Sequence, residues 1–393
     1  MELECEAVRM MRKDYLPFGK PNFGDQEIAA VTRVLRSGWV GMGPETIAFE
    51  RELADSLGVP HVVTVNSCTS ALFLSLLVSG VGRGDEVVCP SLTWCSTANA
   101  ALYLGAKPVF CDVDPDTLCP TPKQVLAKVT SRTKAVMAVH FGGLAVDVKA
   151  LRDALPKRIF IIEDAAHAFG ARFANGKPVG SSGNLTCFSF YANKNLSTGE
   201  GGAVALFDRR QAERLQSLRQ HALPLDAWKR FTHAKALLLS NPLNELGYKM
   251  NYTDLQACIG RVQLVRKGEL DRIRLDIARR YVDGLKEVSP LITLQRDVTH
   301  PYHARHLFVL QLPLGQMRMR RDAVLLALRE KNIGASIHYA PLHLMPLYRG
   351  RRKPVRLPVT EQVSRHTMTL PISASMTRAD ADDVLAQFKT VMQ

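Results

Sequence analysis

One lysine, placed between an apolar strand and a glycine-rich turn, is the first candidate for chemistry. The segment FSFYANKNLSTGEGGAV, residues 188–204, begins as an apolar run, carries Lys194 and continues into the turn. A lysine amine can act as a nucleophile or as a base when its surroundings favour the neutral form. A single lysine at a strand end is more often a solvated charge, so its neighbours must decide between the two interpretations.

A carboxylate occupies a similar position on another predicted strand. The segment IFIIEDAAHAFGA places Asp164 at the carboxyl end of an apolar run, where a charge is costly unless a cation meets it. In open α/β sheets the ligand crevice lies outside the carboxyl ends of the strands. We therefore expect Asp164 and Lys194 to face the same crevice. The alternative is a buried Asp164–Lys194 ion pair without chemical function.

Two further features fit a ligand with a phosphate and a flat ring. Ser67, Thr69 and Ser70 precede the apolar helical run in NSCTSALFLSLL, and a helix N-terminus suits a phosphate. These residues are also ordinary helix caps. Trp94, in CPSLTWCST, follows a strand and could lie on a flat heterocycle, although a lone aromatic side chain is more often part of the core.

Taken together, these side chains match what a protein contributes to pyridoxal phosphate chemistry. That cofactor needs a phosphate site, a stacking ring, a carboxylate for its pyridinium nitrogen and a lysine amine for a Schiff base. Asp164 would keep the ring nitrogen protonated. Lys194 would release the aldehyde of the cofactor to an incoming amine and then move the proton as a general base.

The elements that must position these residues read as an α/β core. Nearly continuous apolar runs occur at EVVCP, PVFCDV, AVMAVHF, IFIIED, CFSFY and GAVALF. Such strands are buried on both faces, which predicts a mostly parallel sheet flanked by helices. Helical periodicity predicts a helix from about Asp25 to Gly38, a second in ETIAFERELADSLG and a third in TSALFLSLLVSG.

The pattern changes after about His221. The stretch from GYKMNYTD to GLKEV predicts two long helices with basic faces, leading into a smaller α+β domain. In that domain HLFVLQLP and ASIHYAP read as strands, MRRDAVLLALREKNI and ADADDVLAQFKTVM as helices. The predicted division is a large cofactor-binding domain over residues 15–260 and a small C-terminal domain over residues 261–393.

Composition limits the class of protein. With 46% hydrophobic and 22% charged residues, the 393-residue chain is typical of a globular protein. The most apolar run, residues 71–78, is far shorter than the ~20 residues that span a bilayer, and the N-terminus lacks a signal peptide pattern. The eight cysteines show neither a C-x-x-C pair nor metal-ligand spacing with histidine, so we expect reduced thiols, no metal site and a cytoplasmic location.

Seven motifs, in this order and at these intervals, carry a family resemblance: SGWVGMGP, GDEVVCPSLTW, FCDVDPDT, IIEDAAHAFGA, FSFYANKNLSTGEGGAV, GYKMNYTDLQACIG and IHYAPLH. The chain resembles the DegT-like nucleotide-sugar aminotransferases, which are pyridoxal-phosphate enzymes of fold type I. The likeness covers nearly the whole chain, from about Tyr15 onward. It is most similar to enzymes that aminate a UDP-linked 4-keto sugar, of the 4-amino-4-deoxy-arabinose type.

The resemblance implies roles at the cofactor ring. Lys194 matches the Schiff-base lysine, Asp164 the partner of the pyridine nitrogen and Trp94 the residue that packs on the ring. His167 matches a position near the phenolic oxygen of the cofactor, with a core-satisfied histidine as the alternative. One branch of the family has histidine in place of the lysine and performs a deoxygenation, which the presence of Lys194 disfavours.

The resemblance also implies phosphate and substrate contacts. Thr69 and Ser70 match the turn that cradles the phosphate, and Ser189 matches a hydroxyl that reaches it. Asn251 matches a residue that reaches the phosphate of the neighbouring subunit, which implies a symmetric homodimer with two shared sites. His338 and Tyr339 match a loop near the sugar nucleotide.

The function that follows is a transamination in two half reactions. We expect an amino group to move from glutamate to the keto carbon of a nucleotide-linked sugar, at C4. The first alternative is an aminotransferase of keto-cyclitols of the scyllo-inosose type, whose activity would need no nucleotide on the substrate. The second is a non-enzymatic regulatory binding protein, because the net charge of +14 permits acidic partners. We expect neither nucleic acid nor a membrane as a partner, since basic residues are not interleaved with aromatic ones.

Two features leave the nucleotide open. Tyr191 stands where similar enzymes carry other aromatic residues or histidine, and the loop GRRKPVRLP, residues 350–358, is unusually basic. This loop reads as a solvated face, with contact to a phosphate as the alternative.

Overall fold

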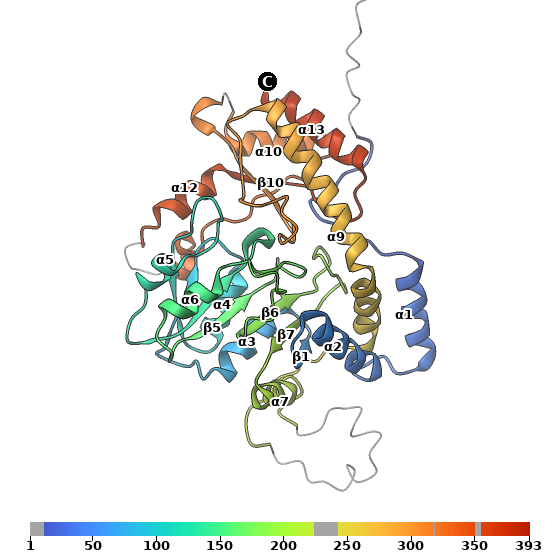
Figure 1. The fold of residues 1–393 in the computed structure, drawn as a ribbon, viewed down its shortest axis with the longest axis vertical. Coiled ribbons are helices and arrows are strands. Elements are labelled where there is room, and N and C mark those ends of the chain that lie inside the picture. Colours follow the sequence, from blue (N-terminus) through green and yellow to red (C-terminus); the bar gives the residue numbers. More distant parts are fainter. Residues whose placement is uncertain (1–11, 224–242, 318, 350–354) are drawn as a thin grey trace, which may run out of the picture.

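The computed structural model describes residues 12–223, 243–317, 319–349 and 355–393 (Figure 1). Its main sheet has seven strands in the order β1-β7-β6-β5-β4-β2-β3. The strands are β1 (His61–Val65), β2 (Glu86–Pro90), β3 (Lys107–Cys111), β4 (Thr133–Val139), β5 (Phe160–Asp164), β6 (Leu185–Ser189) and β7 (Gly202–Leu206).

The pairing of these strands confirms the predicted α/β fold with a mostly parallel sheet. Neighbours from β3 through β2, β4 and β5 to β6 are parallel, while β7 runs antiparallel to both β6 and β1. Alternate residues face opposite sides, so Val87 and Val88 of β2 belong to two different hydrophobic clusters. Burial on both faces explains why the strands read as continuous apolar runs.

Helices cover both faces of the main sheet. On one face α3, α4 and α7 pack in a single cluster with apolar strand residues, and α2, α5 and α6 contribute to the clusters of the other face. The helices of this part are α1 (Asp25–Ser37), α2 (Pro44–Leu57), α3 (Cys68–Val78), α4 (Cys95–Tyr103), α5 (Pro122–Leu126), α6 (Val148–Ala154) and α7 (Arg209–Leu218).

The C-terminal part is built on a three-stranded antiparallel sheet of order β10-β9-β8, with a hydrophobic cluster of its own. Its elements are β8 (Thr293–Leu294), β9 (Phe308–Gln311), α10 (Arg321–Glu330), α11 (Pro346–Arg349), α12 (Pro358–His366), β10 (Thr367–Leu370) and α13 (Arg378–Met392).

The strand predicted at ASIHYAP is wrong. Only Ser336 pairs with a strand, exchanging two backbone hydrogen bonds of 3.0 and 2.8 Å with Thr369. The residues after it leave the small sheet and line a cavity instead. The segment was mistaken for a strand because its apolar and polar residues alternate.

The two long helices predicted after GYKMNYTD are a single helix, α9 (Asp254–Val288), of 35 residues. It begins at a capping box of Thr253 and Gln256 and has glycines at interior positions. A Cβ at Gly260 would lie 2.5 Å from the ring of Phe49, so close packing accounts for that glycine. Figure 1 shows α9 extending from α1 and α2 to α13.

The predicted domain boundary at residue 260 falls inside α9. The separate cluster under the small sheet favours a division into two parts, and residues 15–260 and 261–393 stay a proposal for their extent. Within the described ranges, no helix combines the length and the apolar character needed to cross a membrane.

Candidate active site

A cavity of about 550 Å³ lies at the carboxyl ends of β4, β5 and β6, where Val139, Asp164 and Ser189 line it. This volume is typical of ligand sites. The structure therefore brings the predicted charges to one crevice, as the strand pattern indicated. Of the ten predicted site residues, eight line this cavity: Thr69, Trp94, Asp164, His167, Ser189, Lys194, His338 and Tyr339.

The amine of Lys194 lies at the wall of the cavity. Its Nζ is 3.2 Å from Nε2 of His306. Burial lowers the pKa of Lys194 to about 8, and the positive charge of Arg274 acts in the same direction, while Cys68 and Asp164 oppose the shift. A substantial fraction of the amine is therefore neutral near physiological pH, as a nucleophile or base requires.

Asp164 is a buried carboxylate at the end of β5, only 5% exposed. Its Oδ2 accepts a 2.7 Å hydrogen bond from the hydroxyl of Thr97, and its Oδ1 accepts one of 3.2 Å from the backbone N–H of Ala166. Burial raises the pKa of Asp164, against the effect of these two donors. Among the described ion pairs none involves Asp164, so the alternative of a buried pair with Lys194 is wrong.

His167 is held as a neutral imidazole in one tautomer. The backbone N–H of Gly142 donates to its Nδ1 at 3.3 Å, so the ring proton lies on Nε2, 3.0 Å from the hydroxyl of Tyr339. Burial, followed by the charge of Lys194, lowers the pKa of His167 well below its ordinary value. Because it lines the cavity, His167 is more than a histidine satisfied within the core.

Tyr339, Trp94 and His338 form the wall next to His167. The Trp94 and Tyr339 ring centroids are 5.8 Å apart, and the Trp94 side chain is 60% exposed, so its interpretation as a core residue is wrong. Nδ1 of His338 lies 3.0 Å from the hydroxyl of Thr369. Burial lowers the pKa of His338 to about 3. Burial also raises the pKa of Tyr339 above its ordinary value. This wall is therefore uncharged.

Hydroxyl groups gather where α3 begins. Ser67 caps the helix by accepting a 3.1 Å hydrogen bond from the backbone N–H of Ser70, and the side chain of Ser70 donates to Oδ1 of Asn66 at 2.6 Å. Ser70 does not line the cavity, whereas Ser67, Thr69 and Ser189 do. The first turn of a helix leaves N–H groups without intrahelical partners, so this corner suits an anion.

A glycine lets β7 approach this corner. A Cβ at Gly202 would lie 2.6 Å from the backbone nitrogen of Cys68. Any side chain at this position would displace the turn that opens α3. The glycine-rich stretch after Lys194 thus has a packing reason in the site itself.

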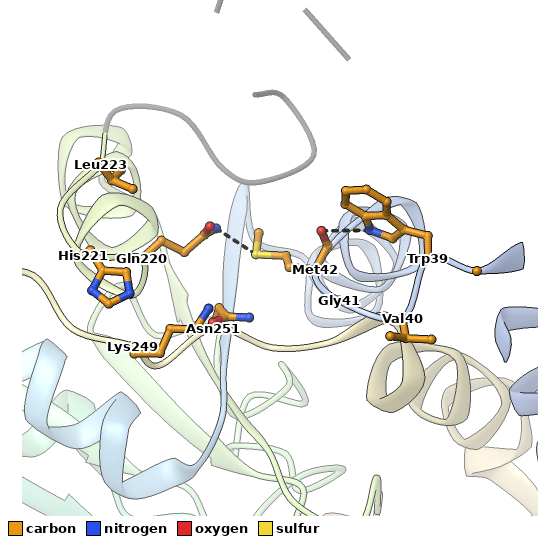
Figure 2. A pocket seen from close by; sticks show the side chains of 10 residues that line it. Trp39, Val40, Gly41, Met42, Gln220, His221, Leu223, Lys249 and Asn251 are labelled. Atoms are coloured by element: carbon orange, nitrogen blue, oxygen red, sulfur yellow. Dashed lines mark hydrogen bonds between the residues drawn. The ribbon is translucent and has the colours of Figure 1, made fainter. Parts of the chain in front are cut away.

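Asn251 lies in a different cavity, of about 300 Å³ (Figure 2). Its Nδ2 donates to the carbonyl of Tyr252 at 3.0 Å. Figure 2 shows Lys249 and Asn251 on one side of this cavity, facing the loop that carries Trp39 and Met42. The chain therefore does not bring Asn251 to its own Lys194, and its predicted reach into a neighbouring subunit stays a prediction.

Two residues that sequence reasoning missed complete the site. His306, in the segment read only as the strand HLFVLQLP, contacts Lys194, and Thr97 holds Asp164. A histidine directly before an apolar strand was the available signal for the first. Thr97 is one of several hydroxyl residues in a helix and had no distinguishing signal.

The predicted contact between the basic loop of residues 350–358 and a phosphate is not tested by the structure. Residues 350–354 lie outside the described residues, and Arg356 is exposed and does not line the main cavity. Tyr191 lines the cavity and is 47% exposed, which leaves it available to a substrate.

The residues present fit pyridoxal phosphate. Asp164 is a buried carboxylate without a cationic partner in the described chain, and such a group is suited to a protonated ring nitrogen. The lysine amine, the exposed Trp94 ring and the hydroxyl corner at α3 line the same cavity. These are the chemical types that this cofactor requires.

Comparison with known proteins agrees with this fit. The sequence profile of the DegT/DnrJ/EryC1/StrS aminotransferase family matches residues 21–389. The spore coat polysaccharide biosynthesis protein SpsC of Bacillus subtilis (strain 168) is 40% identical over 388 residues, covering 97% of this chain and 98% of SpsC.

Two solved structures share the fold. The aminotransferase TlmJ from Streptoalloteichus hindustanus has a TM-score of 0.87 at 33% identity, covering 96% of this chain and 98% of TlmJ. The sugar aminotransferase Spr1654 from Streptococcus pneumoniae, in its PLP form, has a TM-score of 0.87 at 29% identity, with the same coverage.

Proposed function

Since the chain belongs to the DegT/DnrJ/EryC1/StrS aminotransferase family and is a pyridoxal-phosphate-dependent sugar aminotransferase, we propose that it aminates a nucleotide-linked keto sugar at C4 with glutamate as donor. The observation that carries the chemistry is the convergence of Lys194, Asp164 and the hydroxyl corner of α3 on one cavity. Among the described residues, the cavities around Asn251, Lys149 and Asp114 do not combine a lysine, a buried carboxylate and a helix N-terminus.

The residues of the cavity divide the work. Pyridoxal phosphate, when bound, supplies the electron sink that makes the carbon next to the transferred amine acidic. Lys194, with its lowered pKa, takes up the proton of that carbon on Nζ and returns it. Asp164 offers its carboxylate to the ring nitrogen, held in orientation by Thr97.

The remaining contacts bind and orient. Ser67, Thr69 and Ser189 would donate hydrogen bonds to the phosphate, and the Trp94 ring would pack on the cofactor ring. His167, through its Nδ1 contact with Gly142, keeps Nε2–H directed at Tyr339. Ser70 would support the phosphate turn indirectly, because its backbone N–H donates to the hydroxyl of Ser67.

A sugar suits the uncharged wall. His338 is neutral at physiological pH, and the Tyr339 hydroxyl can donate a hydrogen bond to a sugar oxygen while accepting one from His167. The names of SpsC and of Spr1654 connect those relatives to polysaccharide biosynthesis and to sugar amination, respectively. Both support a sugar as the amino acceptor of this chain.

The charges of the cavity support a shared site. Apart from Lys194, no lysine or arginine of the described residues lines it, although glutamate and a diphosphate are both anions. We propose that a second subunit supplies the missing contacts, with Asn251 reaching the cofactor phosphate and Lys249 beside it. The assembly would be a symmetric homodimer.

The identity of the substrate is a further proposal. Among nucleotide sugars, we propose a UDP-linked keto sugar of the 4-amino-4-deoxy-arabinose type. The alternative substrate, which carries no nucleotide, is a keto-cyclitol of the scyllo-inosose type. The cytoplasmic location stays a prediction from the sequence. A purely regulatory binding protein has no use for a lysine of lowered pKa beside an unpaired carboxylate.

Absorbance spectroscopy and a substrate panel test the proposal. Wild type and Lys194→Ala are compared for the visible band of the lysine-bound cofactor, before and after glutamate is added. We expect the band only in the wild type, with bleaching by glutamate. Keto sugars with and without a nucleotide then compete for the aminated enzyme. Turnover of a keto-cyclitol alone would exclude the nucleotide-sugar assignment, and no bleaching would exclude glutamate.

A further inference from the structure

His306 contacts the reacting amine from behind the cavity. Its Nε2 lies 3.2 Å from Nζ of Lys194, and the side chain does not line the cavity. The residue is only 4% exposed, and its ring lies 4.5 Å, centroid to centroid, from that of His167. His306 is therefore placed to act on Lys194 without contacting the substrate.

The segment that carries His306 is hydrogen-bonded to the lysine loop and to the turn that follows β4. The side chain of Asn195, next to Lys194, donates a 2.6 Å hydrogen bond to the carbonyl of Ala304. The backbone N–H of Ala304 donates to Gly143, and that of Leu307 to Gly142, at 2.9 and 3.1 Å. Contacts on both sides of His306, at Ala304 and Leu307, thus fix the distance between the side chains of His306 and Lys194.

The backbone next to His306 is strained. Arg305, which is buried, has φ of 52° in the left-handed region. Such a conformation is unfavourable for a residue with a side chain and persists only when the surroundings enforce it. Its carbonyl accepts a 3.3 Å hydrogen bond from Arg274, and its N–H donates to His303 at 2.8 Å. The fold holds His306 in place against a local preference.

His306 is a neutral imidazole beside Lys194. Its pKa is lowered well below the ordinary value by burial first and by Lys194 next, so the ring is neutral. Its Nδ1 is buried and has no hydrogen-bond partner among the described residues. No protein group therefore fixes the tautomer from the far side, and the ring can present its Nε2 lone pair to the lysine.

We propose that His306 is a positioning residue for Lys194: its Nε2 accepts a hydrogen bond from Nζ and aims the amine at the reacting carbon whenever the lysine is not linked to the cofactor. The bond uses one N–H of the amine and leaves the nitrogen lone pair for the substrate proton. When Lys194 holds that proton as an ammonium group, the same bond becomes charge-assisted. The proposal rests on Lys194 being the reacting amine of the proposed function.

Other titratable groups also act on Lys194. Cys68 at the start of α3 and Asp164 at the end of β5 raise its pKa, and Arg274 of α9 lowers it. His167 and His338 are neutral, because burial lowers both pKa values. His306 differs from these groups in making a direct hydrogen bond to Nζ. Its removal should therefore change the pKa of Lys194 while the other charges stay in place.

The pH dependence of Lys194 modification tests this contact without any sugar. The full-length protein, freed of cofactor, is treated with a small acylating reagent, and mass spectrometry follows the peptide that carries Lys194. In His306→Phe the ammonium form loses its acceptor, so the midpoint should fall by about one pH unit from the wild-type value. In His306→Gln the amide oxygen can accept the hydrogen bond from Lys194 in place of the imidazole. We therefore expect the midpoint of this variant to lie close to the wild-type value.

A matched control is the buried histidine His343, which contacts Ser91 and lies away from the cavity. His343→Gln should leave the Lys194 midpoint unchanged. An equal shift in this control, or a midpoint in His306→Phe within about 0.3 unit of wild type, overturns the proposal. If His306→Phe does not fold, the wild type decides: ring ¹⁵N shifts of His306 should change as Lys194 loses its proton, and constant shifts contradict the contact.

The loaded enzyme provides a second readout. With an α-deuterated amino donor, we expect His306→Phe to lower kcat about tenfold with little change in KM and to increase the isotope effect. A loss confined to KM would overturn a role in aiming the amine. Failure of the sugar assignment would leave the labelling result untouched, so the two proposals fail separately.

Discussion

The hydroxyl of Thr97 donates a 2.7 Å hydrogen bond to the buried carboxylate of Asp164, which has no ionic partner in the described chain. The bond lowers the pKa of Asp164 against the larger effect of burial. Thr97 thereby favours the ionised state that a protonated ring nitrogen requires. This relationship allows the charge and its support to be tested separately.

Asp164→Asn should lower kcat by about 10²–10³-fold, because an amide replaces the charge that faces the ring nitrogen. Thr97→Val should cost only about threefold to tenfold. Because loss of the hydroxyl raises the pKa of Asp164 further, the acid limb of the pH–rate profile should move to higher pH in Thr97→Val. Steady-state kinetics across pH measure both effects, and equal losses in the two variants would contradict a special role for the charge.

Trp94→Ala should weaken cofactor binding about tenfold while leaving the stability of the cofactor-free protein nearly unchanged, because the ring is 60% exposed. Tyr103→Ala is the matched control, since that ring is 62% exposed, lies at the opposite end of α4 and does not line the cavity. Cofactor titration followed by thermal unfolding distinguishes the variants. Similar cofactor affinities in both would exclude stacking by Trp94.

Lys194→Met should stabilise the cofactor-free protein at neutral pH by on the order of 3 kcal/mol, since it removes an amine whose charge is disfavoured by burial. The folded pKa is about 8 and the ordinary value is 10.5, so the unfolded chain binds more protons between these values. Wild-type stability consequently rises with pH across this window, relative to the variant.

The stabilising effect of Lys194→Met should therefore be complete below about pH 8 and shrink toward pH 10.5. Urea unfolding of both proteins at several pH values measures the difference, in which the other titrating groups cancel. A difference independent of pH would show that Lys194 has an unshifted pKa.

Subunit mixing tests the shared site. Lys194→Ala and Asn251→Ala proteins are each expected to be weakly active, but a heterodimer restores one site with the lysine of one chain and the asparagine of the other. Random pairing should return about a quarter of wild-type activity. If Asn251 acts only within its own chain, mixing restores nothing. Wild type mixed with Lys194→Ala controls for subunit exchange.

Much of the fold was predictable because its signals are local. The strands of the main sheet are apolar runs buried on both faces, and each was found from its own residues. The continuity of α9 was not predicted, and the close packing of the Phe49 ring on Gly260 inside this helix is a contact between distant residues that the local pattern does not show. The prediction of a strand at ASIHYAP was wrong because only Ser336 pairs with the small sheet.

The site divides in the same way. Lys194 and Asp164 could be identified because a charge after an apolar strand is costly and demands an explanation. His306 offered only its position before an apolar strand and Thr97 offered no signal, because both act through contacts across 112 and 67 positions of the chain, respectively. The placement of Asn251 in a second cavity depends on the folded arrangement of Trp39, Met42 and Lys249 around it.

Helix α9 has a mechanical consequence for the proposed dimer. At 35 residues it forms a rod about 50 Å long. The helix begins at Asp254, close in sequence to Asn251. Near its middle, Arg274 donates hydrogen bonds to the carbonyls of Arg305 and Ile372. A tilt of the C-terminal part on one subunit would thus swing the start of the rod and the asparagine that serves its neighbour.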